Sequence, residues 1–371
     1  MRQGCQSRNY GIKIIFTDTR SGADASATSI PPSNSQTQPE TIRHWSQIAR
    51  SHARPQAARS TMQLLTTVIP LAGLWAAMML TVDEAYWATL LLAVPAAAFT
   101  ARLFIIQHDC GHRSFFRSRR LNDFVGALIG IVTLTPHEYW RQSHNIHHAT
   151  CGNLQERGIG DVSVLTVAEY TALPAWKRLA YRIYRMPAVL LGFGPIYLFI
   201  IKYRLPLDLI RRHPALLTGV MATNLGIAAA LTGLGYSFGY LDLLMVQLPI
   251  ILLSSTVGVW LFYVQHQFEY TYWKMEKDWD FHEASVRASS YFDLPQPLRW
   301  FTGDIGIHHI HHLSSRIPNY RLGACLADIP ALKTLNRIGL RDSLSCLRLA
   351  LWDESAKCLI PFKALAQKHP A

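Results

Sequence analysis

Histidines at short, regular spacings are the residues of this chain best suited to chemistry. They form three clusters: HDCGH from His108 to His112, HNIHH from His144 to His148, and HHIHH from His308 to His312. On a helix, positions i, i+3 and i+4 share one face. The first cluster therefore presents a pair, and each later cluster presents a triplet toward one side. His309 lies off that stripe, so it is expected either to take no part in metal binding or to contact the ligands from behind.

The number of converging imidazoles indicates two metal ions. A structural zinc takes four ligands, usually including cysteine, so these histidines exceed what one zinc uses. Imidazole suits iron, copper, zinc and nickel alike, and spacing alone does not choose among them. An isolated HxxxH is usually solvated and unliganded. Solvated, unliganded histidines do not readily explain three such clusters in one chain.

Four apolar stretches must position these clusters. Each is about as long as the roughly 20 helical residues that cross a bilayer; they lie at about 61–80, 87–107, 214–234 and 243–265. The second carries Arg102 near its far end, where a long side chain reaches the interface. The other three have no charged residue. Uncharged runs of this length favour a membrane protein over a large soluble one with buried helices.

The placement of the positive charge predicts the topology. All 36 Lys and Arg residues lie outside two windows, 61–101 and 214–269, each a pair of spans with its short loop. The loops carry Asp83, Glu84 and Asp242 instead. The positive-inside rule places both loops outside, and both termini and the histidine clusters in the cytoplasm. The net charge of +12 is thus a topology signal with some attraction to anionic lipid, and no nucleic-acid partner is needed to explain it.

The remaining segments have simpler expectations. Residues 1–40, rich in Ser, Thr, Gln and Pro, predict a disordered tail without signal-peptide features. Residues 41–60 predict an amphipathic segment on the membrane surface. Two apolar runs, 124–134 and 189–201, are too short to span and predict interfacial or re-entrant segments. The six cysteines show no CxxC spacing and are expected to be neither ligands nor disulfides.

The sequence motifs around the clusters resemble those of the membrane-bound fatty acid desaturases, specifically the bacterial acyl-lipid type related to the omega-6 (delta-12) enzymes. The resemblance covers residues 60–325 and rests on HDCGHRSFF, YWRQSHNIHHATCGNL, QHQFEYTYW and GIHHIHHLSSRIPNYRL. It implies a di-iron centre and a further ligand soon after the fourth span, which His266 matches. The implied ligands are His108, His112, His144, His147, His148, His266, His308, His311 and His312.

Carboxylates near the clusters are candidates to orient these ligands, because a ligating histidine usually donates its second N–H to a carboxylate or carbonyl. The candidates are Asp109, Glu138, Asp161, Glu269 and Asp304. Each is equally readable as a helix cap or a solvated charge. The other histidines are expected at the surface or the interface; they are His44, His52, His137, His213, His282 and His369.

The fold class predicted is an all-α membrane protein: four transmembrane helices and a cytoplasmic helical cap that holds the di-iron centre. The desaturase domain is expected over 61–325, with the cap from 108–213 and 266–325, and a cytoplasmic extension over 326–371. The resemblance implies an O2-dependent desaturase that acts on a fatty-acyl chain, preferably lipid-linked, in a bacterial inner membrane. Electrons are expected from an external, ferredoxin-like donor, because the His-Pro-Gly-Gly signature of a fused haem carrier is absent from the sequence.

Two rival functions differ in what they require. A hydroxylase or ketolase of an alkane, sterol or carotenoid would use the same scaffold, and its product would retain oxygen. A metal transporter needs polar ligands near mid-membrane. No histidine lies inside the four predicted spans, which counts against transport.

Overall fold

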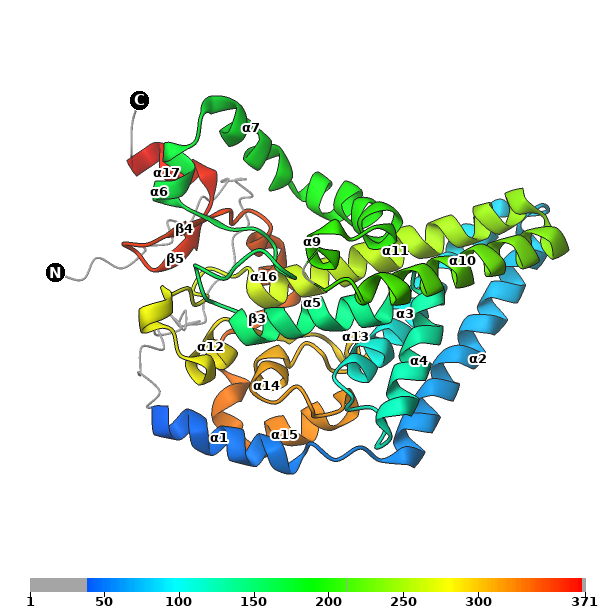
Figure 1. The fold of residues 1–371 in the computed structure, drawn as a ribbon, viewed down its shortest axis with the longest axis horizontal. Helices are drawn as coiled ribbons and strands as arrows, with labels where there is room; N and C mark the ends of the chain where they lie inside the picture. Colours follow the sequence, from blue (N-terminus) through cyan, green and yellow to red (C-terminus); the bar gives the residue numbers. More distant parts are fainter. Residues whose placement is uncertain (1–38, 212, 369–371) are drawn as a thin grey trace, which may run out of the picture.

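The fold is seen in a computed structural model, which describes residues 39–211 and 213–368. The predicted disordered tail over 1–40 falls almost entirely outside these residues. The protein has a stem of long helices and a cap of short ones (Figure 1).

The stem consists of four helices long and apolar enough to cross a membrane, which confirms the four predicted spans. They are α2 (Ala57–Thr81), α3 (Tyr86–Gly111), α10 (Leu216–Phe238) and α11 (Tyr240–His266). Each extends past its predicted span at one end or both, although α10 begins two residues later than predicted. The extensions of α3 and α11 are the important ones, because they carry His108 and His266 on the last turns of membrane helices.

The stem is centred on α3, which packs against α2, α4 and α11. Ala93, Ala96 and Ala97 are buried along it, and side chains this small let neighbouring helices approach closely. The outer faces of the stem instead expose large apolar side chains, such as Leu91 on α3 and Leu225 on α10. In a bilayer these side chains face lipid.

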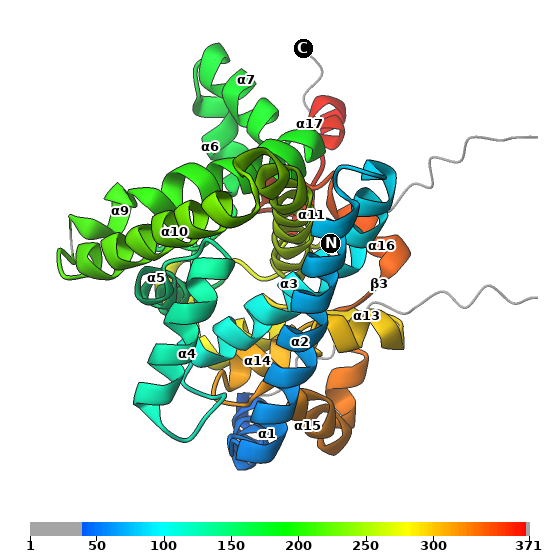
Figure 2. The same ribbon diagram turned by 90° about the vertical axis from the view of Figure 1, so that its right-hand side faces the viewer.

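The cap gathers helices from distant parts of the sequence around the end of the stem (Figures 1 and 2). Its main helices are α1 (Pro39–Ser51), α4 (Arg119–Val132), α5 (His137–Thr150), α12 (Phe281–Arg287), α14 (His308–Leu313) and α15 (Leu322–Asp328). The remaining ones are α6 (Val167–Ala172), α9 (Leu207–Ile210), η4 (Glu276–Asp278), α13 (Gln296–Phe301), η5 (Asn319–Arg321), η6 (Pro330–Lys333), α16 (Leu340–Cys346) and α17 (Phe362–Lys368).

Helix α1 buries its apolar face against protein. Ile42, Trp45 and Ala49 pack in one cluster with Ile310 of α14 and Leu322 of α15. The sequence predicted an amphipathic segment on the membrane surface over 41–60, and the structure shows that the apolar face of α1 packs on the cap. Its amphipathic pattern is that of any helix lying on a protein core.

Within residues 39–211 and 213–368, two small sheets supplement the helices, and the sequence did not predict them. β1 (Leu165–Thr166) pairs in parallel with β4 (Leu351–Asp353), which pairs in antiparallel with β5 (Cys358–Ile360). β2 (Tyr291–Asp293) pairs in parallel with β3 (Arg337–Gly339). Strands of two or three residues are too short to show a period-2 pattern. They join residues 337–360 to segments within 61–325, so the chain after residue 325 packs as part of the cap.

The two shorter apolar runs behave differently from each other. The first lies in α4, a helix of 14 residues. The second follows α7 (Ala175–Tyr184) as a helical run from Val189 to Arg204, built from η1 (Val189–Phe193), α8 (Gly194–Ile196), η2 (Tyr197–Ile201) and η3 (Lys202–Arg204). This run is bent by 63° from α7. By length and composition alone, the two together would suffice for a broken span or a re-entrant segment.

Candidate metal centre

Four separate segments bring the cluster histidines together where the stem meets the cap. His108 lies on the last turn of α3 and His112 directly follows that helix. The second cluster lies on α5, the third on α14, and His266 is the last residue of α11. The centre is thus attached to the ends of two membrane helices.

The nine histidines fall into two groups, in each of which the ligand atoms lie within 4.8 Å of one another. The five-histidine group is His108, His112, His144, His148 and His311; the four-histidine group is His147, His266, His308 and His312. These are the nine histidines that the resemblance implied as ligands.

Each histidine triplet divides between the two groups. On α5, His144 and His148 belong to the five-histidine group, whereas His147 belongs to the other. Successive helical residues are about 100° apart, so the i and i+4 side chains diverge by about 40° and the i+3 side chain leans away by about 60°. On α14 the same rule sends His308 and His312 to the four-histidine group and His311 to the five-histidine group.

The ring nitrogens point at one another as ligands of a shared ion do. Nε2–Nε2 distances are 3.1 Å for His144–His148 and for His308–His312, and 3.0 Å for His266–His308. Two ligands at adjacent corners of an octahedron stand about 3.0 Å apart when each nitrogen is about 2.1 Å from the metal. The Nε2 atoms of His108 and His112 are buried without a hydrogen-bond partner. The donor set therefore fits a metal ion in each group.

Burial keeps these imidazoles in the form that binds metal. His308, His311 and His312 are almost fully buried, and desolvation, with a smaller contribution from neighbouring imidazoles, holds the pKa of each well below its ordinary value. A neutral imidazole has a free lone pair, as coordination requires.

Two of the five candidate carboxylates contact cluster histidines. Asp161 Oδ1 lies 2.5 Å from His147 Nδ1, and Asp109 Oδ1 lies 3.2 Å from His108 Nδ1. A carboxylate at Nδ1 fixes the tautomer and leaves Nε2 for the metal. His147 Nε2 lies 3.1 Å from His266 Nε2 of the same group, and His108 Nε2 is buried without a hydrogen-bond partner.

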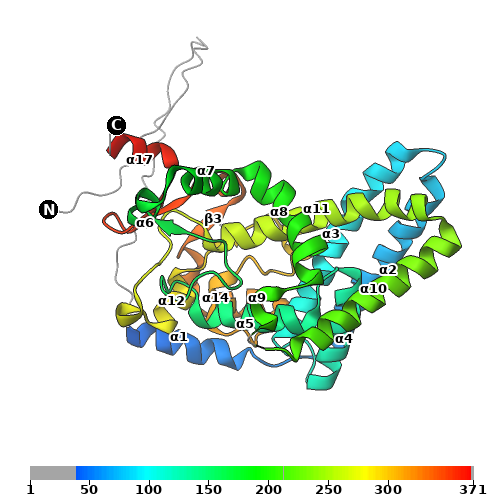
Figure 3. The ribbon, with the colours of Figure 1, turned by 45° about the horizontal axis from the view of Figure 1, so that its top comes forward.

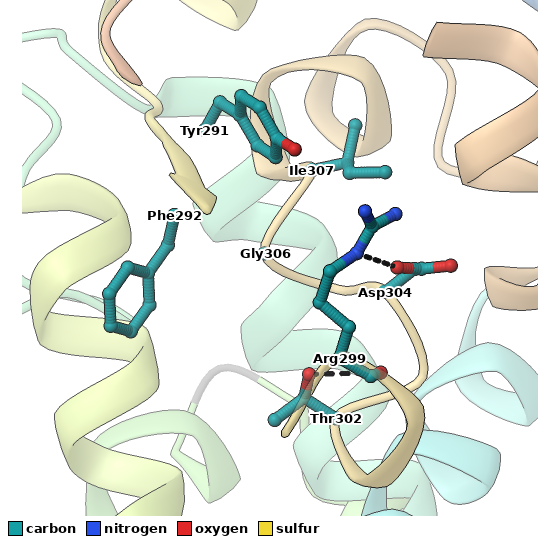
Figure 4. Close-up of a pocket in the computed structure, with 7 residues that line it drawn as sticks. All are labelled: Tyr291, Phe292, Arg299, Thr302, Asp304, Gly306 and Ile307. Atoms are coloured by element: carbon teal, nitrogen blue, oxygen red, sulfur yellow. Dashed lines mark hydrogen bonds and ion pairs between the residues drawn. The ribbon is translucent and has the colours of Figure 1, made fainter. Parts of the chain in front are cut away.

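The other three candidates have different partners. Glu138 forms an ion pair with Arg141 on the next turn of α5. Asp304 accepts from Arg299 Nε at 2.7 Å, beside a small pocket that none of the nine histidines lines (Figure 4). The contact recorded for Glu269 is through its carbonyl oxygen, which accepts from Leu359 N. The structure does not bring these three carboxylates to the cluster histidines.

Some residues at the centre had no usable signal in the sequence. The Ala288 carbonyl lies 3.0 Å from His266 Nδ1 and can accept a hydrogen bond from it, and a backbone carbonyl carries no side-chain signature. Asn319 donates to Asp109 Oδ2 through both its backbone N–H and its side-chain Nδ2. The indole of Trp140 stacks on His144 with ring centroids 4.5 Å apart. Asn319 stands in the quoted motif GIHHIHHLSSRIPNYRL, but only the structure shows what it contacts.

The remaining histidines separate into buried and exposed residues. His309, expected off the stripe, belongs to neither group; its Nε2 lies 2.8 Å from the Leu332 carbonyl. His52 and His137 are buried, so the default surface assignment was wrong for them. His52 pairs with Asp328, and burial lowers the pKa of His137 to about 4. His44 and His213 are exposed, His282 is half-buried, and His369 lies outside the described residues.

Fold and site together define a membrane protein with a histidine-rich metal centre at the boundary of its membrane helices. Comparison with known proteins identifies the family. The fatty acid desaturase family profile matches residues 85–336. A fatty acid desaturase of Bacillus subtilis is 45% identical over 317 residues, covering 85% of this chain and 89% of that protein. The chain belongs to the fatty acid desaturase family, a family of oxidoreductases.

More distant relatives carry more specific names. An sn-1 acyl-lipid omega-3 desaturase (ferredoxin) of Synechocystis is 31% identical, covering 59% of this chain and 61% of that protein. An sn-1 oleoyl-lipid 12-desaturase of the same organism is 28% identical, covering 59% of this chain and 62% of that protein. These names describe the relatives' substrates and electron source.

Proposed function

We propose that this protein is an O2-dependent acyl-lipid desaturase whose nine histidines hold two iron ions, five around one and four around the other. The observation that carries the proposal is the division of nine histidines from four segments, eight of them buried and His148 half-buried, into two groups with ligand spacing. Imidazole is a common iron ligand, and family membership makes iron the first metal to test.

Bound iron would supply the reductive activation of O2 that removes two hydrogens from neighbouring methylenes. The balanced reaction converts CH2–CH2, O2, two electrons and two protons into CH=CH and two waters. Everything else falls to the chain. Asp161 and Asp109 hold the tautomers of His147 and His108, and the buried shell around the groups keeps bulk water away.

The stem supports a membrane substrate. Because the last turns of α3 and α11 carry His108 and His266, an acyl chain in the bilayer lies close to the centre without the lipid leaving the membrane. We propose a lipid-linked acyl chain, supported by the acyl-lipid names of the relatives, and the delta-12 (omega-6) position, supported by the oleoyl-lipid 12-desaturase. The relatives include omega-3 enzymes, so the test must report bond position.

Electron supply and topology complete the proposal. A ferredoxin-like protein is the proposed donor, since two relatives are named ferredoxin desaturases. The positive-inside rule supports a cytoplasmic cap and cytoplasmic termini in a bacterial inner membrane. The far end of the stem carries Asp83 and Glu84 in the loop between α2 and α3 and Asp242 in the first turn of α11, and the sequence has no Lys or Arg there.

The test is expression in a bacterium that lacks polyunsaturated lipids, with a ferredoxin supply and analysis of membrane fatty acids by gas chromatography and mass spectrometry. We expect a new diene from the unmodified chain, none from His147→Ala, and an unchanged yield from His213→Ala, an exposed histidine outside both groups. A hydroxylated or keto product would show that the protein is a hydroxylase or a ketolase and not a desaturase. Unchanged lipids from iron-loaded protein with a working donor would refute the proposal.

A further inference from the structure

Helix α7 has its polar and apolar faces reversed relative to a helix on a soluble protein. Its inner face carries Tyr181 and, just beyond the helix, Arg185, both buried and hydrogen-bonded. Its outer face exposes 67% of Trp176, 59% of Leu179 and 47% of Ile183. Positions 176, 179 and 183 form one stripe at helical spacing, so the stripe that faces away from the protein is apolar.

The inner face explains why this orientation is fixed. The Tyr181 hydroxyl donates to the Ala350 carbonyl at 2.7 Å, and Arg185 Nη2 donates to Tyr263, Gln267 and Leu349 at 2.7 to 3.0 Å. Rotating α7 to hide its apolar stripe would leave these buried donors and acceptors unpaired. The exposed stripe is therefore a stable feature of the folded chain.

The apolar stripe continues past the bend. Phe193, Tyr197 and Ile201, again at helical spacing, are 71%, 56% and 59% exposed. This run is anchored to the stem, because Thr256 of α11 donates to the Leu191 carbonyl at 2.8 Å. The exposed surface thus passes from α7 to the faces of α10 and α11 that meet lipid. In Figures 1 and 2, α7 lies at the edge of the molecule, and Figure 3 shows the run beside α11.

We propose that α7 and the 189–204 run form an in-plane membrane arm that binds anionic phospholipids of the leaflet next to the cap. The stripe lies among acyl chains, and the exposed cations Lys177 and Arg178 lie at the lipid headgroups. Helix α7 contains no Asp or Glu, so nothing on it opposes an anionic headgroup. Continuity with the stem's lipid-facing surface is what selects a bilayer over a second protein chain as the occupant.

Contact with brominated lipids, which quench a nearby fluorophore, tests the arm without any need for activity. Bimane is attached to the cysteine of the Leu179→Cys variant of the full-length chain, and each nanodisc holds one copy of this chain. The five cysteines in the described part of the chain are buried, and Cys5→Ser removes the remaining one. Glu354→Cys, exposed between β4 and β5, is the matched control.

We expect brominated phosphatidylcholine to quench bimane at residue 179 and not at residue 354. Brominated phosphatidylglycerol, mixed as a minority lipid, should quench residue 179 more strongly. Lys177→Gln with Arg178→Gln should weaken that preference by about five-fold for each charge removed. Two outcomes would overturn the proposal. In one, an aqueous quencher reaches bimane at residue 179 in discs that hold one copy of the chain. In the other, bimane is shielded from that quencher only when two copies share a disc.

Discussion

The two histidine groups differ in how their members are held, and the smaller group is held more firmly. In the four-histidine group, His147 Nδ1 meets Asp161 at 2.5 Å and His266 Nδ1 meets the Ala288 carbonyl at 3.0 Å. Its members are between 0 and 6% exposed. In the five-histidine group, the carboxylate contact is the longer one from His108 to Asp109, and His148 is only half-buried.

This difference suggests that ligand number and ligand anchoring compensate for each other. Orienting partners restrict a histidine before the metal arrives, so each anchored ligand loses less freedom on binding. The four-histidine group has fewer ligands, and these have stronger anchors. The five-histidine group has one histidine more, so it still has four ligands after one is removed. Removing a ligand should therefore harm the smaller group more, and removing an anchor should do the same to a lesser degree.

The largest effect is expected from removing a ligand of the smaller group. His266→Ala leaves three histidines there, whereas His112→Ala leaves four in the larger group. We expect His266→Ala to lose about one bound iron per chain and more than about 100-fold of desaturation, and His112→Ala to keep more of its iron. Iron per chain by mass spectrometry and product yield measure this.

The control for these variants is His282→Ala, a half-buried histidine outside both groups, which should retain both ions. Equal iron loss from His266→Ala and His112→Ala would break the comparison between the groups.

The second effect concerns the carboxylate anchor. Asp161→Asn preserves shape and removes the charge opposite His147, and Asp161 Oδ2 has no other hydrogen-bond partner to lose. We expect iron affinity of the four-histidine group to fall by about 10–100-fold, with the other group unaffected. Anaerobic titration of the metal-free chain with ferrous iron resolves the two affinities. An unchanged affinity of the four-histidine group would show that Asp161 does not orient His147.

The third effect is indirect and acts on the larger group. Asn319 donates twice to the buried Asp109 Oδ2, and its own Oδ1 accepts from Gln63 of α2 at 2.9 Å. Asn319→Ala removes the side-chain donor and unpairs Gln63, which should lower the free energy of unfolding by about 1–3 kcal/mol. It should also weaken iron binding by the five-histidine group, because Asp109 then holds His108 less firmly.

Asn122→Ala separates these two consequences. Asn122 is equally buried and bonds to the backbone of Phe116, away from both groups. It should lose similar stability in thermal unfolding of the metal-free chain and keep its iron affinity. Parallel losses of affinity in both variants would mean that Asn319 acts through general stability alone.

The sequence predicted the parts of the centre that follow from spacing and length. Uncharged runs of about 20 residues indicated the four spans, and helical periodicity with the family resemblance indicated all nine cluster histidines. The division into two groups also follows from helical geometry, since His144 and His148 diverge less from each other than from His147. The triplets were interpreted as facing one side, which is why the division was missed.

Other features depend on contacts between distant segments, which one sequence does not contain. The Ala288 carbonyl reaches His266 because α12 packs against α14 and α5 and ends just before Ala288, next to the last residue of α11. Glu138 and Asp304 lie close to histidines in the sequence, but both form ion pairs with arginines. Glu138 pairs with Arg141, and Asp304 pairs with Arg299. The small sheets arise from pairings such as β2 with β3, whose strands are too short to leave a pattern.

The smallest effect is a dependence on pH that belongs to α5, the helix that serves both groups. His137 begins α5 and packs against Gly126, with both ring nitrogens buried and unpartnered. Burial lowers the pKa of His137 to about 4 from an ordinary 6.5. The unfolded chain therefore takes up a proton as the pH falls below 6.5 while the folded chain does not, so stability falls with acidification until about pH 4.

His137→Leu should remove this contribution, which is about 2 kcal/mol at pH 5. Thermal unfolding of the metal-free chain between pH 7.5 and pH 5, matching the ordinary titration range of histidine, measures it. The variant should lose less stability on acidification than the unmodified chain, and His213→Leu, exposed, should match the unmodified chain. At neutral pH the leucine should cost little, because no hydrogen bond is lost with the imidazole. An identical acid response in the two variants would mean that the pH dependence of α5 arises from the cluster histidines and not from His137.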